Sequence, residues 1–388
     1  MIPLHEIAAT PFEDPWHLPL ADRLRTLAQG AKRVAYFYER ADNSTFRYRI
    51  YNMAQVLNDG TGEVAAAYFF LADLARLGDI ADLADVLVIC RTRYDQQVGQ
   101  LIRAFQARRK PVLFDTDDFV FDSAYVHLLA ETLALDTGNP QVWNDWFAYT
   151  GRLGATLKLC DGAITTTTPL AERIRAFAGV PVSIVPNFMN REQLAMSARV
   201  WDAKQQRKPG DDGLIHFGYF SGSPSHARDF ALVAPVLEEL LEEHPEVGLV
   251  VAGYIEAGSR LERFGRRVQT YPFQDYVNLQ RLIGTVEFNM MPLQANVFTH
   301  CKSPLKYFEA AAVGAVSIAS PTDVYAAAIR HGDNGYLVRA GLWAEGLRHA
   351  LRDMDRYQAI AERARADALA KYSWTVQRPQ ILNALRFE

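Results

Sequence analysis

Residues 300–319 read HCKSPLKYFEAAAVGAVSIA, and this stretch predicts a helix followed directly by a buried strand. Ser303 is a residue type that caps helix N-termini. Pro304 suits the first helical position, because the amide N–H that proline lacks would have no partner there. Gly314 is typical of a left-handed helix end, and the apolar run Val316–Ala319 follows as a strand. We therefore expect one helix–strand unit of a parallel sheet.

The start of this helix is a candidate anion site. A helix N-terminus offers free N–H groups and about half a positive charge. Lys302 and Lys306 add two full charges at an end where cations oppose the helix dipole, and an anionic ligand would explain them. Lys306 and Glu309 are three residues apart and share a face. The alternative is a surface ion pair between these two side chains, worth a few tenths of a kcal/mol.

The alternation of apolar runs and helical patterns extends outward from this unit and occurs twice, which is typical of parallel sheets built from βαβ units. In the first half the expected strands are Val34–Tyr38, Val64–Phe70, Val86–Cys90, Val112–Asp115, Ala163–Thr166 and Ser183–Pro186. In the second half they are Leu214–Phe217, Val247–Ala252, Val268–Gln269, Val286–Met290, Val316–Ala319 and Tyr336–Val338.

Helices are expected between these strands, and the 388 residues suit two domains. The expected helices are Tyr48–Leu57, Gln96–Arg108, Leu170–Phe177, Phe230–Glu243, Tyr276–Leu282, Pro304–Val313 and a helical region from Leu342 onward. A polar stretch ending in Pro209-Gly210 predicts a linker. The predicted parts are an N-terminal domain over 1–190, a linker over 191–213, a C-terminal domain over 214–372, and a C-terminal helix over 373–388 that packs back on the N-terminal domain. Open α/β sheets bind ligands at the carboxyl ends of their strands, so we expect the function there.

The composition narrows the class of protein. A formal net charge of −4 argues against a general nucleic-acid binder, so we expect no nucleic-acid partner. The N-terminus has no signal-peptide pattern and no long apolar run occurs, which predicts a cytoplasmic protein. The three cysteines and nine histidines have no metal-ligand spacing, so we expect neither a disulfide framework nor a bound metal.

The segment around Glu309 resembles the family 4 glycosyltransferases (glycosyl transferases group 1). In that family a helix of the form E-x7-E is followed by small residues, a glycine and an apolar strand. Glu309, with AAAVGAVSIAS after it, matches the second glutamate, which the resemblance assigns to the ribose hydroxyls of a donor nucleotide. The first glutamate, which contacts the donor sugar, falls at Cys301. The resemblance thus places the nucleotide and leaves the identity of the sugar open.

The stretch Leu214–Asp229 resembles the family's first strand and loop of the donor domain, which bring backbone amides and a basic side chain onto the diphosphate. The alternative is a Ser/Gly/Pro turn with a solvated arginine. Further resemblances are Asp333–Val338 and Asn187, the latter also interpretable as a turn residue before the linker. The resemblance gives as donor-binding residues Gly218, Ser221, Gly222, His226, Arg228, Tyr271, Lys302, Ser303, Lys306 and Glu309.

The first half carries the candidate acceptor residues. Arg47 and Arg49 diverge on a helix, so at most one should face the cleft. Arg91 follows a strand and could bind an acceptor or pair with Asp115 or Asp117. Asp117 and Asp118 lie at a strand end, where a general base or a cation site could form. Carboxylates so placed also occur in single-domain, metal-dependent GT-A enzymes, but the complete second βαβ series argues against that class.

The resemblance implies a GT-B fold, two Rossmann-like domains facing each other across a cleft. It implies a glycosyltransferase that moves a hexose-type sugar from a nucleoside diphosphate donor to a hydroxyl of a glycan or lipid-linked glycan, in bacterial surface polysaccharide synthesis. Configuration would be retained without a metal or other cofactor. An inverting route would need Asp117 or Asp118 as base, and Arg228 and Lys306 are the other catalytic candidates.

Two alternatives to this enzyme class remain. A sugar-nucleotide epimerase has the same fold, and a non-catalytic nucleotide-sugar-binding protein would explain the loss of the first glutamate. The aromatic face around Trp143, Trp146 and Phe147 is expected to pack internally or, as the alternative, to meet a lipid acceptor or the inner face of the membrane.

Overall fold

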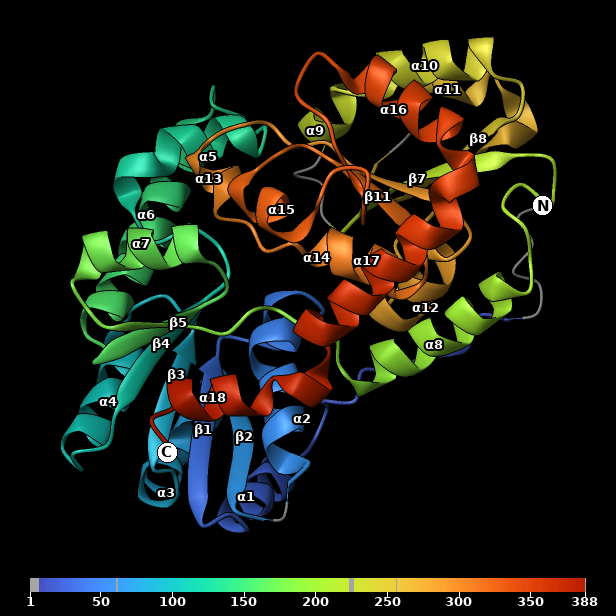
Figure 1. Ribbon diagram of the computed structural model, residues 1–388. Coiled ribbons are helices and arrows are strands. Elements are labelled where there is room, and N and C mark those ends of the chain that lie inside the picture. The colour runs from blue at the N-terminus through green and yellow to red at the C-terminus, as the bar shows by residue number, and fades with distance from the viewer. Residues whose placement is uncertain (1–6, 61, 223–226, 256, 388) are drawn as a thin grey trace.

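The computed structural model describes residues 7–60, 62–222, 227–255 and 257–387, and Figure 1 shows them as two α/β domains. Each domain contains a parallel six-stranded sheet with helices packed on it. The predicted class, α/β with two doubly wound domains, is therefore confirmed.

The N-terminal sheet has the strand order β2-β1-β3-β4-β5-β6, so the direction of winding reverses between β1 and β3. Its strands are β1 (Lys32–Tyr38), β2 (Val64–Phe70), β3 (Val86–Cys90), β4 (Val112–Thr116), β5 (Gly162–Thr165) and β6 (Val182–Ile184). Its helices are α1 (Leu20–Ala28), α2 (Asn52–Asn58), α3 (Leu77–Leu83), α4 (Gln96–Gln106), α5 (Val126–Thr132), α6 (Pro140–Lys158) and α7 (Thr168–Ala178).

The C-terminal sheet has the order β12-β11-β10-β7-β8-β9, with the reversal between β10 and β7. Its strands are β7 (Ile215–Ser221), β8 (Val247–Gly253), β9 (Val268–Tyr271), β10 (Phe288–Met291), β11 (Val316–Ala319) and β12 (Tyr336–Leu337). Its helices are α9 (Ala227–Ala231), α10 (Ala234–Glu243), α11 (Ser259–Glu262), α12 (Tyr276–Ile283), α13 (Val297–His300), α14 (Leu305–Ala312), α15 (Asp323–Ala328), α16 (Trp343–Arg352) and α17 (Tyr357–Tyr372).

The helix–strand unit predicted from residues 300–319 is present as α14 and β11, with one correction. The helix begins at Leu305 rather than at a Ser303 cap. Pro304, at φ −79° and ψ 43°, is the N-cap residue: its carbonyl accepts from the Tyr307 and Phe308 amides at 3.1 and 3.3 Å, and no side chain caps the helix. Gly314 has a φ of +75°, as its predicted role at the helix end requires.

The predicted linker contains a long helix. Residues 191–205 form α8 (Arg191–Gln205), where the sequence predicted irregular structure. Asn190 starts it, because its side-chain oxygen accepts a hydrogen bond from the Gln193 amide at 2.9 Å. α8 packs against α12 and α14 and runs beside the C-terminal domain (Figure 1).

The chain returns to the N-terminal domain at its end. After α17 it forms α18 (Arg378–Ala384), which contacts α2 and β6. The Arg378 guanidinium donates to the carbonyl oxygens of Val56 and Leu57 at 3.2 and 3.0 Å. At this crossing the Met189 amide donates to the Tyr372 carbonyl at 2.8 Å, and the Trp374 amide donates to the Met189 carbonyl at 3.0 Å. The two crossings between the domains are thus joined side by side.

All three cysteines are buried and unbonded to one another. Among the described residues, no helix combines the length and apolar character needed to span a bilayer.

Candidate functional site

A cavity of about 540 Å³ lies between the two domains. Its lining comes from the carboxyl ends of strands in both sheets. Asp117 and Asp118 follow β4, whereas Ser221 and Gly253 end β7 and β8. The cleft expected from the two α/β halves is therefore where the sheet topology places ligand sites.

Lys302, Ser303 and Lys306, at and before the start of α14, all line this cavity. The Lys306 ammonium lies over the Tyr219 ring, 4.7 Å from its centroid. Burial, with a smaller contribution from the charge of Lys302, lowers the pKa of Lys306 to about 8 against the opposing charges of Asp229 and Glu309. An anion at this point would favour the charged form of Lys306.

Glu309 lines the same cavity and is only 7% exposed. Its Oε1 accepts hydrogen bonds from the Tyr48 hydroxyl and from Gln193 Nε2, the latter at 3.0 Å. Arg47 Nη2 lies 3.8 Å from the same oxygen. The carboxylate therefore does not pair with Lys306 as in the surface-pair alternative; it is held by groups of the N-terminal domain and α8.

Several polar atoms of the lining have no hydrogen-bond partner among the residues that the structure describes. They are Ser303 Oγ, Asn289 Oδ1, Asn43 Oδ1 and Asn187 Nδ2. The other half of the Asn289 amide is fixed, because its Nδ2 donates to the Lys306 carbonyl at 3.1 Å. Buried polar groups are normally hydrogen-bonded, so this set marks a place where a polar ligand would supply partners.

On the N-terminal side of the cavity, Arg91 brings the two carboxylates together. Its Nη1 lies 3.5 Å from Asp117 Oδ1 and 3.2 Å from Asp118 Oδ2, and it donates to Thr45 Oγ1 at 3.1 Å. Arg91 has a φ of +36°, a strained conformation of the kind found at functional sites. Burial, together with the charge of Asp118, raises the pKa of Asp117 to about 6.

Arg47 and Arg49, both in the helical turn Arg47–Tyr51 that precedes α2, separate as expected. Arg47 reaches the cavity, with its guanidinium 3.9 Å from the Tyr48 ring centroid. Arg49 does not, because it is fully buried and forms a bidentate pair with Asp115, at 2.7 and 2.9 Å. Arg49 also donates to the Val185 carbonyl at 2.8 Å. Arg49 therefore has a structural role, and it does not reach the cavity where the sequence predicted an acceptor contact.

Three other candidates lie away from the lining. Arg228 donates to the Glu131 carbonyl at 2.6 Å, across the domain boundary. Gly218 is in the middle of β7, packed against Phe220 and Val286, and the Tyr271 hydroxyl donates to Gln269 at 2.8 Å. Ser221 and Gly222 do line the cavity, and His226 lies outside the described residues.

Cys301, which stands where the resemblance expects a sugar-binding glutamate, is 1% exposed and packs in an apolar cluster with Phe298. Burial raises the pKa of its thiol to about 12. Its carbonyl accepts a hydrogen bond from the Thr167 hydroxyl of the N-terminal domain at 3.1 Å. The position therefore serves the contact between the domains.

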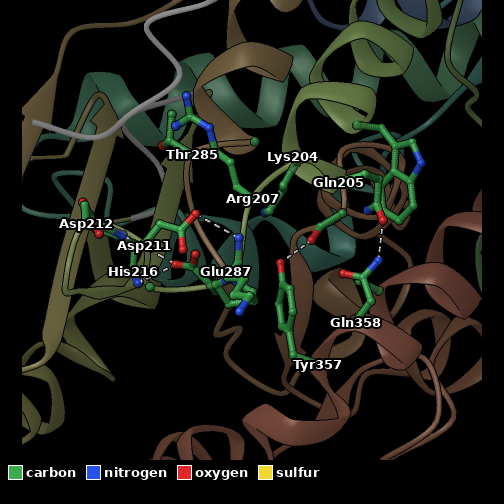
Figure 2. Close-up of a pocket in the computed structure, with 17 residues that line it drawn as sticks. Lys204, Gln205, Arg207, Asp211, Asp212, His216, Thr285, Glu287, Tyr357 and Gln358 are labelled. Atoms are coloured by element: carbon green, nitrogen blue, oxygen red, sulfur yellow. Dashed lines mark hydrogen bonds and ion pairs between the residues drawn. The ribbon is translucent and has the colours of Figure 1, made fainter.

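A second, smaller cavity of about 50 Å³ lies at the amino end of the C-terminal sheet (Figure 2). His216 lies between two carboxylates there, with Nδ1 3.5 Å from Glu287 and Nε2 3.5 Å from Asp212. Lys204 Nζ donates to the Val286 carbonyl at 2.5 Å. Burial lowers the pKa of Lys204 to about 8, partly offset by Glu287. The space is too small for a nucleotide, and both His216 and Lys204 interact with groups of the protein itself.

The two facing α/β domains, with the large cavity between them, have the GT-B fold, and a sequence comparison agrees for the C-terminal domain. Residues 204–367 match the model of the family described as glycosyl transferases group 1. The resemblance and the class of enzyme predicted from the sequence are confirmed at the level of this group. No curated protein matches the chain in sequence.

Solved structures with the same fold cover both domains. The Anabaena protein HepE in complex with UDP and glucose has a TM-score of 0.61 and 14% identity, covering 92% of this chain and 99% of that one. WaaG, a glycosyltransferase involved in lipopolysaccharide biosynthesis, has a TM-score of 0.59 and 12% identity, covering 90% and 99%. A glycosyltransferase from Rickettsia africae has a TM-score of 0.59 and 11% identity, covering 92% and 98%. At these identities the likeness shows the fold.

Tyr48 and Gln193, the partners of Glu309, and Asn289 were not predicted from the sequence. Gln193 is the third residue after the Asn190 cap, a spacing that marks helix starts and could have placed it on a helix. Gly253 was also missed: a Cβ there would lie 1.8 Å from the Ser221 carbonyl oxygen, so only glycine lets β7 and β8 end side by side at the cavity.

Proposed function

We propose that this chain transfers a sugar from a nucleoside diphosphate donor to a hydroxyl of a glycan or glycoconjugate acceptor. The observation that carries the proposal is that one cavity is lined by Lys306 and Glu309 of the C-terminal domain and by Asp117 and Asp118 of the N-terminal domain. The relatives support the donor class, since HepE was crystallised with UDP and with UDP-glucose. They support the acceptor class too, since WaaG acts in lipopolysaccharide biosynthesis.

On the donor side, Lys306, Lys302 and the start of α14 would bind the diphosphate, and Glu309 the ribose. Transfer breaks the bond between the sugar C1 and the β-phosphate oxygen, and the electron pair leaves with the diphosphate. Because negative charge grows on that group, a cation there stabilises the transition state more than the ground state. Among the residues that the structure describes, we assign this role to Lys306, which lines the cavity. Arg228 lies outside the lining and donates to the Glu131 carbonyl instead.

On the acceptor side, the acceptor hydroxyl forms the new bond to C1 and loses its proton. In the retaining route that the family resemblance implies, the proton passes to the departing phosphate oxygen, and the reaction needs no metal or other cofactor. In an inverting route Asp117 would take it, and a pKa of about 6 suits a general base near neutral pH. A role in surface polysaccharide synthesis at the inner face of the membrane is part of the same proposal.

A thermal-shift screen of nucleoside diphosphates tests the donor site. A diphosphate at a hundred times its dissociation constant should add about 2.7 kcal/mol of stability. Glu309→Gln should weaken the diphosphate and the free nucleoside alike, because both carry the ribose. No shift with any nucleoside diphosphate would contradict the proposal.

A product assay separates the alternatives of other classes. Incubation of donor with and without an acceptor should give a transferred sugar only when the acceptor is present. Interconversion of the donor sugar alone would identify an epimerase. Nucleotide binding without hydrolysis or transfer would identify a non-catalytic binding protein.

A further inference from the structure

The cavity that Asp117 and Asp118 line also has an apolar wall. Residues of both domains form it, namely Val120, Leu133, Trp146, Leu293 and Phe298. Trp146 is the largest of these side chains and, like Leu133, is partly exposed, whereas Val120, Leu293 and Phe298 are buried. Apolar walls with a few polar groups are typical of sites for organic ligands.

Contacts fix the Trp146 ring relative to the carboxylates. Its ring meets that of Tyr149 edge on, with centroids 5.5 Å apart and planes at 75°. The Tyr149 hydroxyl accepts a hydrogen bond from Arg91 Nε at 3.1 Å, and Arg91 Nη1 holds Asp117 and Asp118. Two residues therefore connect the indole to the carboxylate pair.

The neighbouring tryptophan of α6 has a different position. The Trp143 indole donates to the Thr137 carbonyl at 2.9 Å, and its ring lies 4.8 Å from that of His127. Trp143 is outside the cavity lining, one helical turn from Trp146. The two residues share chemistry and helix but differ in access to the cavity, so Trp143 is a matched control.

We propose that Trp146 determines acceptor specificity, as the surface on which a pyranose ring of a glycan acceptor stacks. A pyranose has a C–H face that packs on an aromatic ring and hydroxyl groups at its rim that carboxylates accept. A lipid chain alone would cover the apolar wall but would offer no hydroxyl group to Asp117 and Asp118, whose described donor is the Arg91 guanidinium. The combination of indole, apolar wall and two carboxylates fits a sugar ring. This inference rests on the proposed function.

An array of pyranose-containing oligosaccharides, with polyprenyl phosphates as separate spots, tests the inference on the full-length protein in the presence of UDP. The wild-type protein should bind one or more oligosaccharides. Trp146→Ala should weaken that binding about tenfold, since an aromatic contact contributes about 0.5–1.5 kcal/mol beyond the area it buries. Trp146→Phe should restore part of it, and Trp143→Ala should leave it unchanged.

Donor hydrolysis, measured on the same variants, separates this inference from the proposed function. Hydrolysis should be equal in the wild-type protein and in Trp143→Ala, which lies outside the cavity lining. Binding of polyprenyl phosphates alone, binding of no glycan, or equal losses in the two alanine variants would overturn the role of Trp146. The proposed function would stand if the donor were still hydrolysed, and fall if it were not.

Discussion

Lys204 and Lys306 are two half-buried lysines at opposite ends of the C-terminal sheet, and desolvation lowers the pKa of each to about 8. Lys204 donates to the Val286 carbonyl beside Glu287, in a cavity of about 50 Å³. Lys306 faces an aromatic ring in a cavity of about 540 Å³. A lowered pKa therefore does not identify a functional lysine. What differs is whether the protein or a ligand supplies the partner.

The largest expected effect is on diphosphate binding. Lys306→Met should weaken UDP binding by up to about 100-fold, because a hydrogen bond to a charged group contributes about 1.5–3 kcal/mol, and should leave uridine binding unchanged. Isothermal titration calorimetry with both ligands measures this. Lys204→Met is the control and should bind UDP as the wild type does. Equal weakening of UDP and uridine would remove Lys306 from the phosphate site.

The pH dependence of UDP binding should be nearly as large. The diphosphate favours charged Lys306 and so raises its pKa above the value of about 8 in the free protein. Affinity should be full below about pH 8 and fall as the pH rises through 8, approaching tenfold per pH unit. The phosphate itself is ionised by then, since its second pKa is about 6.

Variants assign this pH profile to one lysine. Calorimetric titrations between pH 7 and 9.5 should give a nearly flat profile for Lys306→Met, while Lys204→Met should keep the slope of the wild type. A slope retained in Lys306→Met would mean that another group titrates.

The two lysines should exchange roles in the stability of the fold, where Lys204 should matter more than Lys306. Lys204→Met should lower the free energy of unfolding by about 1–3 kcal/mol, because it leaves the buried Val286 carbonyl without its donor. Lys306→Met should not lower it, since burial of the Lys306 charge outweighs its attraction to Asp229 and Glu309. Urea unfolding at pH 7 compares them. A larger loss in Lys306→Met than in Lys204→Met would contradict the contrast between the two sites.

Both lysines should also make stability depend on pH. Their folded pKa values lie below the unfolded value of 10.5, so the unfolded chain binds more protons between about pH 8 and 10.5. Their contribution to stability should therefore rise with pH across that window. Each Met variant should lose its own part of the rise in urea unfolding.

The smallest expected effect belongs to Lys302. It lines the cavity but is partly exposed, with its ammonium 4.8 Å from the Phe298 ring centroid. Lys302→Ala should weaken UDP binding only about two- to fivefold, and salt near 1 M should abolish the difference, because exposed charges are screened. A loss as large as that of Lys306→Met would show that both lysines hold the diphosphate equally.

The sequence was informative wherever local patterns determine structure. Apolar runs predicted the strands Val64–Phe70, Val86–Cys90 and Val316–Ala319 residue for residue. A strand that is buried on both faces needs apolar side chains along its whole length, so it is visible in the sequence as a continuous apolar run. α8 was missed, because its mostly polar residues do not form a clear apolar stripe.

The site was predictable in part. Lys306, Glu309, Asp117 and Asp118 share one cavity, as the strand and helix ends indicated. The sequence gave no sign that Glu309 is held by Tyr48, 261 positions away, because such a contact depends on how the two domains meet. Arg49 and Arg47 were indistinguishable by type, and only packing sends one into the core.

The crossings at Met189 and Tyr372 place two segments of the chain side by side between the domains, where rotation of one domain against the other would bend them. Two covalent connections joined by backbone hydrogen bonds resist sliding and permit rotation about the line on which they lie. Opening of the cavity would then separate Glu309 from Tyr48 and Lys306 from Asp117 in one movement. The nucleoside diphosphate and the glycosylated acceptor would then be released in one conformational step, because the opening that frees one product also exposes the other.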